Sequence, residues 1–218
     1  MWTDEIVSMI IKGIGETLYM TVCSTLFGYL LGLPVGVLLA VSAKDGIHPN
    51  AAVYRVLDVV ANILRSIPFL ILLILLIPFT RSVVGKSYGS TATIVPLVIA
   101  AAPFIARMVE SSVKEVDSGV VEAAKAMGAD TFTIIVKVLL VEARTSILTG
   151  VTIALGTVLG YSAMAGTVGG GGLGDIAVRY GYYRYQEDIM IVTVVLLIVL
   201  VQLFQFVGMK LASGIDHR

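Results

Sequence analysis

The stretch LYMTVCSTLFGYLLGLPVGVLLAVS, residues 18–42, contains no charged side chain. An α-helix rises about 1.5 Å per residue, so about 20 consecutive apolar residues cross the hydrocarbon core of a bilayer. The stretch is long enough to do this as a single helix. It therefore predicts a transmembrane span, and with it a membrane protein.

Other apolar runs of similar length cover residues 91–106, 146–165 and 189–207. A fifth run, 66–79, is too short alone and has to borrow from residues 56–65, which contain Asp58 and Arg65. The runs are continuously apolar and lack the alternation of barrel strands, which argues against a β-barrel. The sequence predicts an all-α, polytopic membrane protein with five transmembrane helices.

The overall composition agrees with this class. Of the 218 residues, 57% are hydrophobic and only 14% are charged, and the mean hydropathy is +0.96. The formal net charge is zero, so the basic footprint of a nucleic-acid-binding protein is missing. The single cysteine, Cys23, lies in an apolar run and is expected to be a small buried hydrophobe. The two histidines, His48 and His217, form no cluster, so we predict neither a metal site nor a catalytic site.

Charged residues at the ends of the spans predict the orientation of the chain. Lys12 and Glu16 precede the first long run, and no small-residue cleavage site closes it, which argues against a signal peptide. Residues 1–17 are expected to form an amphipathic interfacial segment with Trp2 at the membrane surface. Placing the N-terminus outside puts ten of the fifteen Lys and Arg residues inside. The positive-inside rule therefore favours N-terminus out and C-terminus in, with residues 212–218 as a cytoplasmic tail.

The longest predicted cytoplasmic segment, residues 110–145, is unusually polar for this chain. It is expected to form two short helices separated by Gly128, which suits a left-handed C-cap. Asp117 or Ser118 can cap the first helix, and Asp130 or Thr131 the second. The first helix is predicted to show a shallow apolar face to another protein, made of Val120, Ala123, Ala124 and Met127. On the second helix, Phe132, Ile135 and Leu139 are predicted to share a face.

Within this segment, Glu122, Ala123 and Ala124, followed by Gly128, resemble the EAA-loop signature of permease subunits of ABC importers. The resemblance implies the type I ABC importer permease fold over residues 18–211, with a coupling helix that docks into a cleft on a cytoplasmic ATPase. The family pattern continues with Ile-x-Leu-Pro, whereas this chain has Val138-Leu139-Leu140-Val141. Without that proline, the second helix is free to run on. The alternative interpretation is an amphipathic hairpin with no partner.

Motifs elsewhere in the chain resemble the methionine-uptake branch of the same family. They are Gly15-Glu16-Thr17-Leu18, Arg65-Ser66-Ile67-Pro68-Phe69, residues 102–110, residues 126–129 and Gly160-Tyr161-Ser162-Ala163-Met164. The resemblance implies a homodimer in the inner membrane, two ATPase subunits and an extracytoplasmic substrate-binding protein. It also implies methionine as the substrate, L- and possibly D-. ATP and Mg would be bound by the ATPase, and this chain would hold no cofactor.

Two groups of glycines are interpreted differently. The GGGGLG stretch, residues 169–174, satisfies G-x-G-x-x-G, but no βαβ unit surrounds it, so it is expected to be a flexible outer loop. Gly28, Gly32 and Gly36 recur every four residues in the first span. They form a close-packing face for another helix of the chain or for a dimer seam.

Absent motifs separate the possible transport mechanisms. No G-x-x-x-x-G-K-[ST] is present, so energy from ATP has to come from a partner subunit. The four spans other than the second carry no Asp, Glu, His, Lys or Arg, which argues against an ion-coupled secondary transporter. A permease for another small amino acid or zwitterion, and a passive channel, remain open.

The predicted translocation path is uncharged. Tyr161, Ser162 and Met164 end the fourth span and are expected to form an apolar gate on the axis of a dimer, since a fixed charge would hold a zwitterion too tightly. Asp58, Asn62 and Arg65 stand at i, i+4 and i+7 and share one helix face. That face is expected to point into an inner vestibule, toward the ATPase or toward another helix, or simply to project into the cytosol.

Overall fold

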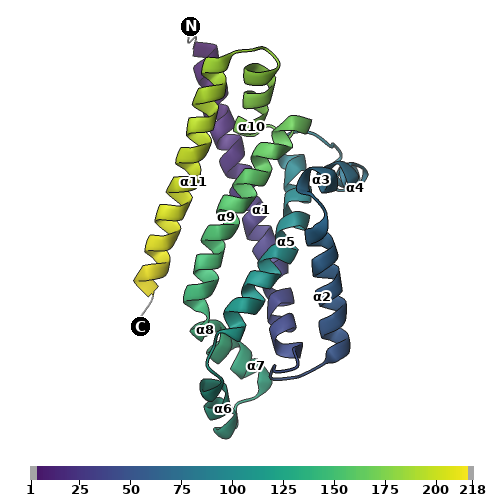
Figure 1. The fold of residues 1–218 in the computed structure, drawn as a ribbon, viewed down its shortest axis with the longest axis vertical. Helices are drawn as coiled ribbons and strands as arrows, with labels where there is room; N and C mark the ends of the chain where they lie inside the picture. Colours follow the sequence, from purple (N-terminus) through teal and green to yellow (C-terminus); the bar gives the residue numbers. More distant parts are fainter. Residues whose placement is uncertain (1–3, 216–218) are drawn as a thin grey trace.

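The computed structural model describes residues 4–215. Within that range, four helices are long and apolar enough to cross a membrane, and a bent pair of helices that passes the same test together brings the number to five if it is counted as one span. The long helices are α1 (Asp4–Ser42), α5 (Ser90–Lys114), α9 (Arg144–Ala165) and α11 (Glu187–Ile215), and the bent pair is α2 (Ala51–Ser66) with α3 (Phe69–Leu75). The predicted all-helical membrane architecture is confirmed. α1, α5 and α9 run side by side through the centre, while α11 lies at one edge and α2 at the other (Figure 1).

α1 and α5 form the tightest helix pair because glycines remove side chains from their contact. A Cβ added at Gly32 would lie 2.7 Å from the carbonyl oxygen of Ala102, and one at Gly36 would lie 2.4 Å from that of Ala106. In a bilayer, where lipid tails are as apolar as leucine, such backbone approach drives helix association. Gly28, Gly32 and Gly36 of α1 therefore pack against α5 of the same chain and do not form a dimer seam.

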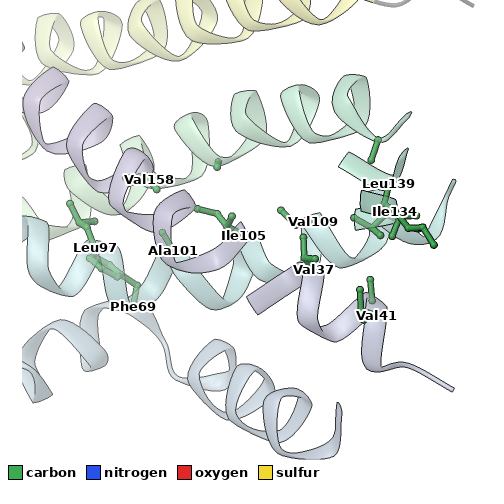
Figure 2. Close-up of a cluster of buried hydrophobic side chains, with 14 of the residues drawn as sticks. Val37, Val41, Phe69, Leu97, Ala101, Ile105, Val109, Ile134, Leu139 and Val158 are labelled. Carbon is green, nitrogen blue, oxygen red and sulfur yellow. The ribbon is translucent and has the colours of Figure 1, made fainter. Parts of the chain in front are cut away.

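The core follows the same helices along their whole length. Val37 and Val41 of α1 belong to one buried cluster with Leu97, Ile105 and Val109 of α5; the two valines lie at the Val109 end of it and Leu97 at the other end (Figure 2). Val158 of α9 and Phe69 of α3 close the cluster on its other sides, and Ile134 and Leu139 extend it beyond the end of α5. The segment after α5 is thus packed on the transmembrane bundle.

The first helix differs from the sequence prediction at its N-terminal end. The expected boundary between an interfacial segment and a span, at residue 17, falls inside α1, which is one continuous helix from Asp4 to Ser42. Ile10, Gly13 and Thr17 are buried, so this part of α1 packs against the rest of the chain. This packing explains why α1 continues through residue 17 without a break. Trp2 lies outside the described residues.

The predicted second span is broken. α2 and α3 meet at an angle of 100°, because Pro68 lacks an N–H and Ile67 before it takes an extended conformation (φ −81°, ψ 123°). α3 and the following α4 (Ile77–Val84) lie across the end of the bundle instead of continuing along it (Figure 1).

The glycine-rich stretch is folded, which corrects the expectation of a flexible loop. After α9 the chain forms a 3₁₀ turn η2 (Gly166–Val168), the short helix α10 (Gly172–Ile176) and a π-helical turn η3 (Ala177–Tyr182). Leu173 and Gly174 are buried. Glycine serves here to let backbones touch, and the segment is packed between α1 and α9.

The polar segment lies at the end of the molecule opposite the start of α1 (Figure 1). It comprises α6 (Ser118–Ala126), α7 (Thr131–Thr133), the π-helix η1 (Ile134–Leu139) and α8 (Leu140–Glu142). The last three form one helical stretch that leads into α9. The second helix does run on, as the missing proline allows.

Candidate functional site

α6 is capped at both ends by the residues that the sequence indicates. The amide of Gly119 donates to Asp117 Oδ1 at 2.7 Å. Gly128 has φ +82°, and the amides of Gly128 and Ala129 donate to the carbonyls of Lys125 and Ala124 at 2.9 and 3.1 Å. This pair of bonds is a Schellman C-cap. α6 is therefore a short helix with defined ends, held on a sharp turn.

One face of α6 is buried and the other is open. Val121 and Ala124 pack into the core, so Ala124, predicted to be on the outer apolar face, instead points inward. Glu122 and Ala123 are exposed, and Met127 is 83% exposed. Of the signature residues, the glutamate and the first alanine are therefore available to a partner, while the second alanine anchors the helix.

The second half of the segment adds one aromatic side chain to this open surface. The Thr133 amide donates to Asp130 Oδ1 at 3.2 Å, and hydrogen bonds from Thr133 hold the pKa of the Asp130 carboxyl below its ordinary value. Phe132 is 71% exposed, whereas Ile134 and Leu139 are buried. The predicted shared face of Phe132, Ile135 and Leu139 is wrong: Ile135 and Leu139 pack on the core and Phe132 does not. The π-helix that begins at Ile134 is wound more widely than an α-helix, so the α-helical spacing used for the prediction does not hold across it.

A cleft of about 320 Å³ separates α6 from the turn between α1 and α2. Asp45 and Ile47 line it from the turn, Lys114 from the end of α5, and Glu122 and Lys125 from α6. Its wall therefore carries both charge signs. The exposed side chains that we consider as a candidate coupling surface, and call the coupling surface below, are Val120, Glu122, Ala123, Lys125, Met127 and Phe132.

The stripe on α2 faces another helix, one of the predicted alternatives. Arg107 of α5 donates to both Asp58 and Asn62, the latter at 3.0 Å. Arg65 is exposed and forms no hydrogen bond or ion pair that the structure records within residues 4–215. The structure thus brings Asp58 and Asn62 together with α5 and leaves Arg65 outside.

Glu110 is the centre of this network and was missed by the sequence prediction. Its side chain is 6% exposed, and it accepts bonds from Arg107 at 2.7 Å, Lys114 at 2.8 Å and the Tyr54 hydroxyl at 3.2 Å. A signal was present, since Arg107, Glu110 and Lys114 are spaced i, i+3 and i+7 and match the i, i+4, i+8 spacing of polar residues on α2. The two basic side chains, Arg107 and Lys114, and the two acidic ones, Asp58 and Glu110, balance in charge, and their bonds join α2 to α5.

The predicted gate residues point in different directions. Tyr161 stacks on Phe69 of α3. The Ser162 hydroxyl is buried and donates to the carbonyl of Leu159 at 2.8 Å. Met164 is 50% exposed. Only Met164 of the three is thus directed away from the rest of the chain.

Comparison with known proteins assigns these features to a family. The family model for "Binding-protein-dependent transport system inner membrane component" matches residues 32–216. The chain is 54% identical to the "Probable D-methionine transport system permease protein MetI" of Vibrio cholerae over 203 residues, which are 93% of this chain and 90% of that protein. It is 50% identical to the "D-methionine transport system permease protein MetI" of Escherichia coli K12 over 164 residues, 75% and 76% of the two chains.

A solved structure agrees with these relatives. The one described as "Inward facing conformations of the MetNI methionine ABC transporter: CY5 native crystal form" superposes with a TM-score of 0.97 at 48% identity, covering 99% of this chain and 100% of that one. The family resemblance read from the sequence is confirmed. The chain belongs to the family of inner membrane components of binding-protein-dependent transport systems.

Proposed function

We propose that the chain is the translocation subunit of an ATP-driven importer of methionine, L- and D-, across the inner membrane. Two copies would form the path, two ATPase subunits would supply energy and bind ATP with Mg, and an extracytoplasmic binding protein would deliver the substrate. The names of the two relatives, matched over 93% and 75% of this chain, support the substrate. The name of the solved homologue supports an ATP-driven assembly.

The coupling surface is the observation that carries the ATP-driven mechanism. Met127 and Phe132 are large apolar side chains left 83% and 71% exposed on a segment outside the spans, and such exposure is typical of a protein contact. Glu122 beside them is placed to meet a basic residue of the ATPase. We assign Glu122, Ala123, Ala124 and Gly128 to ATPase coupling on this basis.

Packing gives the coupling surface a route to the spans. Val121 and Ala124 of α6 share a core cluster with Val109 of α5 and Val158 of α9. Packed cores shift between discrete arrangements and do not stretch. When ATP binding closes the ATPase pair, a rigid displacement of α6 would therefore move the cytoplasmic ends of α5 and α9 and favour the outward-open state.

The gate would lie at the opposite end of α9. Tyr161, Ser162 and Met164 are uncharged, which suits a zwitterion with an apolar side chain that has to be released again. Met164 is flexible and exposed, and methionine fills irregular gaps. Arg65, at the end of α2, would face the inner vestibule. The placement of the start of α1 and of α6 at opposite ends supports an outside N-terminus and an inside C-terminus (Figure 1).

Uptake by the complete complex tests this function. The chain is co-expressed with its ATPase, purified, reconstituted into vesicles with the binding protein, and supplied with labelled L-methionine. We expect uptake to depend on ATP. An excess of unlabelled L- or D-methionine should inhibit uptake of the label, and other amino acids should not. Uptake competed better by another amino acid would overturn the substrate, and uptake without ATP would overturn the mechanism.

A further inference from the structure

The segment that follows the gate has a backbone that only glycine tolerates. Gly169, Gly171 and Gly172 have φ values of +80°, +80° and +76°, in the left-handed region where other residues are strained. Gly171 occupies the N-cap position of α10 and has no side chain to accept the first free amides of that helix. The cap has to come from elsewhere in the fold.

α1 supplies the missing cap from 156 residues away in the sequence. The amide of Gly172 donates to Glu16 Oε2 at 2.8 Å, and the amide of Leu173 donates to Thr17 Oγ1 at 2.9 Å. The fit leaves no room, because a Cβ at Gly171 would lie 2.8 Å from Glu16 Oε2 and one at Gly172 would lie 2.7 Å from Thr17 Oγ1. Glu16 and Thr17 are therefore matched to these glycines.

α10 in turn touches the last turn of α9 backbone to backbone. A Cβ at Gly174 would lie 2.2 Å from the carbonyl oxygen of Ala163, and one at Gly166 would lie 2.2 Å from the amide nitrogen of Asp175. Ala163 stands between Ser162 and Met164. Any displacement of Met164 with this turn therefore has to move α10 or open the contact between them.

α5 holds the same segment from its other side. The amide of Gly89 donates to the carbonyl of Gly169 at 2.9 Å, and the Thr93 hydroxyl lies 3.3 Å from the carbonyl oxygen of Gly170, to which it donates. The glycine segment is thus tied to both helices of the tightest pair in the fold.

We propose that Glu16 and Thr17 are positioning residues of the outward gate. By capping α10 they hold the last turn of α9, and with it Met164, in its closed arrangement, and these two bonds are exchanged for water when the gate opens. The assignment deepens the proposed function and rests on the gate that it includes. The Glu16 side chain is 30% exposed, so water reaches it readily, whereas Thr17 is 1% exposed and meets water only when α1 and α10 separate.

The test uses paired substitutions, one that removes the acceptor and one that keeps it, in the complete transporter in lipid nanodiscs. Thr17→Val removes the acceptor at nearly constant shape, while Thr17→Ser keeps it. Glu16→Ala removes the carboxylate, while Glu16→Gln keeps an oxygen that can accept. Lys12→Ala is the control, because Lys12 is 78% exposed and its Nζ lies 3.9 Å from Glu16 without touching either amide.

Two readouts are followed without nucleotide. The first is hydrogen–deuterium exchange of residues 169–177. The second is labelling from the outer side of Met164→Cys in a background that carries Cys23→Ser. We expect Thr17→Val and Glu16→Ala to raise both rates about two- to tenfold, the factor expected from the loss of one hydrogen bond. Thr17→Ser, Glu16→Gln and Lys12→Ala should stay near the parent rate.

The outcomes separate this inference from the proposed function. Faster exchange with unchanged labelling of Met164→Cys would show a structural cap only and overturn the positioning role. Unchanged exchange would show that the two bonds do not hold the segment, and would overturn it as well. A failure to transport methionine would overturn the proposed substrate, while exchange and labelling, which need no substrate, would still decide the role of Glu16 and Thr17.

Discussion

The rings of Phe69 and Tyr161 lie parallel, with centroids 4.6 Å apart and 7° between their planes. Phe69 is the first residue of α3, directly after the bend at Pro68, and Tyr161 lies in the last two turns of α9. The stack thus joins the broken second span to the candidate gate.

The stack should be worth more than the burial of its rings. A double-mutant cycle with Phe69→Ala and Tyr161→Ala should give a coupling free energy of about 0.5–1.5 kcal/mol, as stacked aromatic pairs do. Tyr161→Phe, which keeps the ring, is the matched control and should be nearly neutral. The measurement is the midpoint of thermal unfolding of the purified complex. Strict additivity of the two alanine substitutions would show that the rings do not interact.

The effect of a substitution at Gly128 should depend on whether the new residue adopts a left-handed backbone conformation, and not on the size of its side chain. Its φ is +82° and an added Cβ would meet no atom within 4 Å, so strain alone opposes a side chain. Gly128→Val should cost about 1–2 kcal/mol and lower ATP-coupled uptake, because the turn after α6 loses its shape. Gly128→Asn should be close to the parent, since asparagine adopts left-handed conformations. Equal loss in both variants would indicate a steric cause and contradict this account.

The ends of α6 and the start of α7 were predictable from sequence because the signals are local. Asp117, Gly128 and Asp130 act on amides or carbonyls within five residues of themselves, so one short window contains both the cap and what it caps. The network around Glu110 is different. Its partners Tyr54 and Lys114 come from two helices, and no rule of spacing within either helix says that the two stripes face each other.

The glycine-rich stretch shows how one composition signal permits two structures. A run of glycines is typical of a flexible loop, but it equally permits backbones to approach where any side chain would clash. Gly174 against Ala163 is the second case. The deciding acceptors, Glu16 and Thr17, lie on α1, far outside the stretch. Pro68 likewise signals a bend, but not that α3 and α4 turn across the bundle.

Arg107 should be essential for stability because it balances two carboxylates. Arg107→Met removes one partner of Asp58 and one partner of Glu110, whose side chain is 6% exposed. Removing one partner of a buried ion pair costs about 3–5 kcal/mol of folding free energy. The double variant Arg107→Met/Glu110→Gln removes a charge of each sign and should recover much of the loss. Unfolding midpoints of the purified complex measure both. No recovery in the double variant would mean that shape, not charge, makes Arg107 important.

Glu122→Arg should uncouple the transporter and leave the permease folded. Glu122 is exposed, so the substitution buries no charge within this chain. At a docked interface, losing one partner of a desolvated charge pair costs about 2–5 kcal/mol, a loss of roughly 30-fold or more in affinity. Stimulated ATP hydrolysis and methionine uptake should both fall to background. Glu5→Arg, the same charge change in the first turn of α1, at the end of the molecule opposite α6, is the control. Activity near the parent level in Glu122→Arg would remove the docking role.

Met164 should report the gate directly. Its side chain is 50% exposed on a turn whose neighbours Ser162 and Ala163 are held within the chain, so in a homodimer with its axis beside α9 the two copies would face each other. Met164→Cys, with Cys23→Ser as the background, should form a disulfide between subunits in the resting state. When ATP is trapped on the ATPase, the outward-open arrangement separates the two turns, and the yield should fall. Thr167→Cys, on the exposed turn that follows, controls for collisions between neighbouring complexes and should respond less to nucleotide. A yield at Met164→Cys that nucleotide never changes would place a static contact where we expect a gate, and no disulfide in any state would place this turn away from the dimer axis.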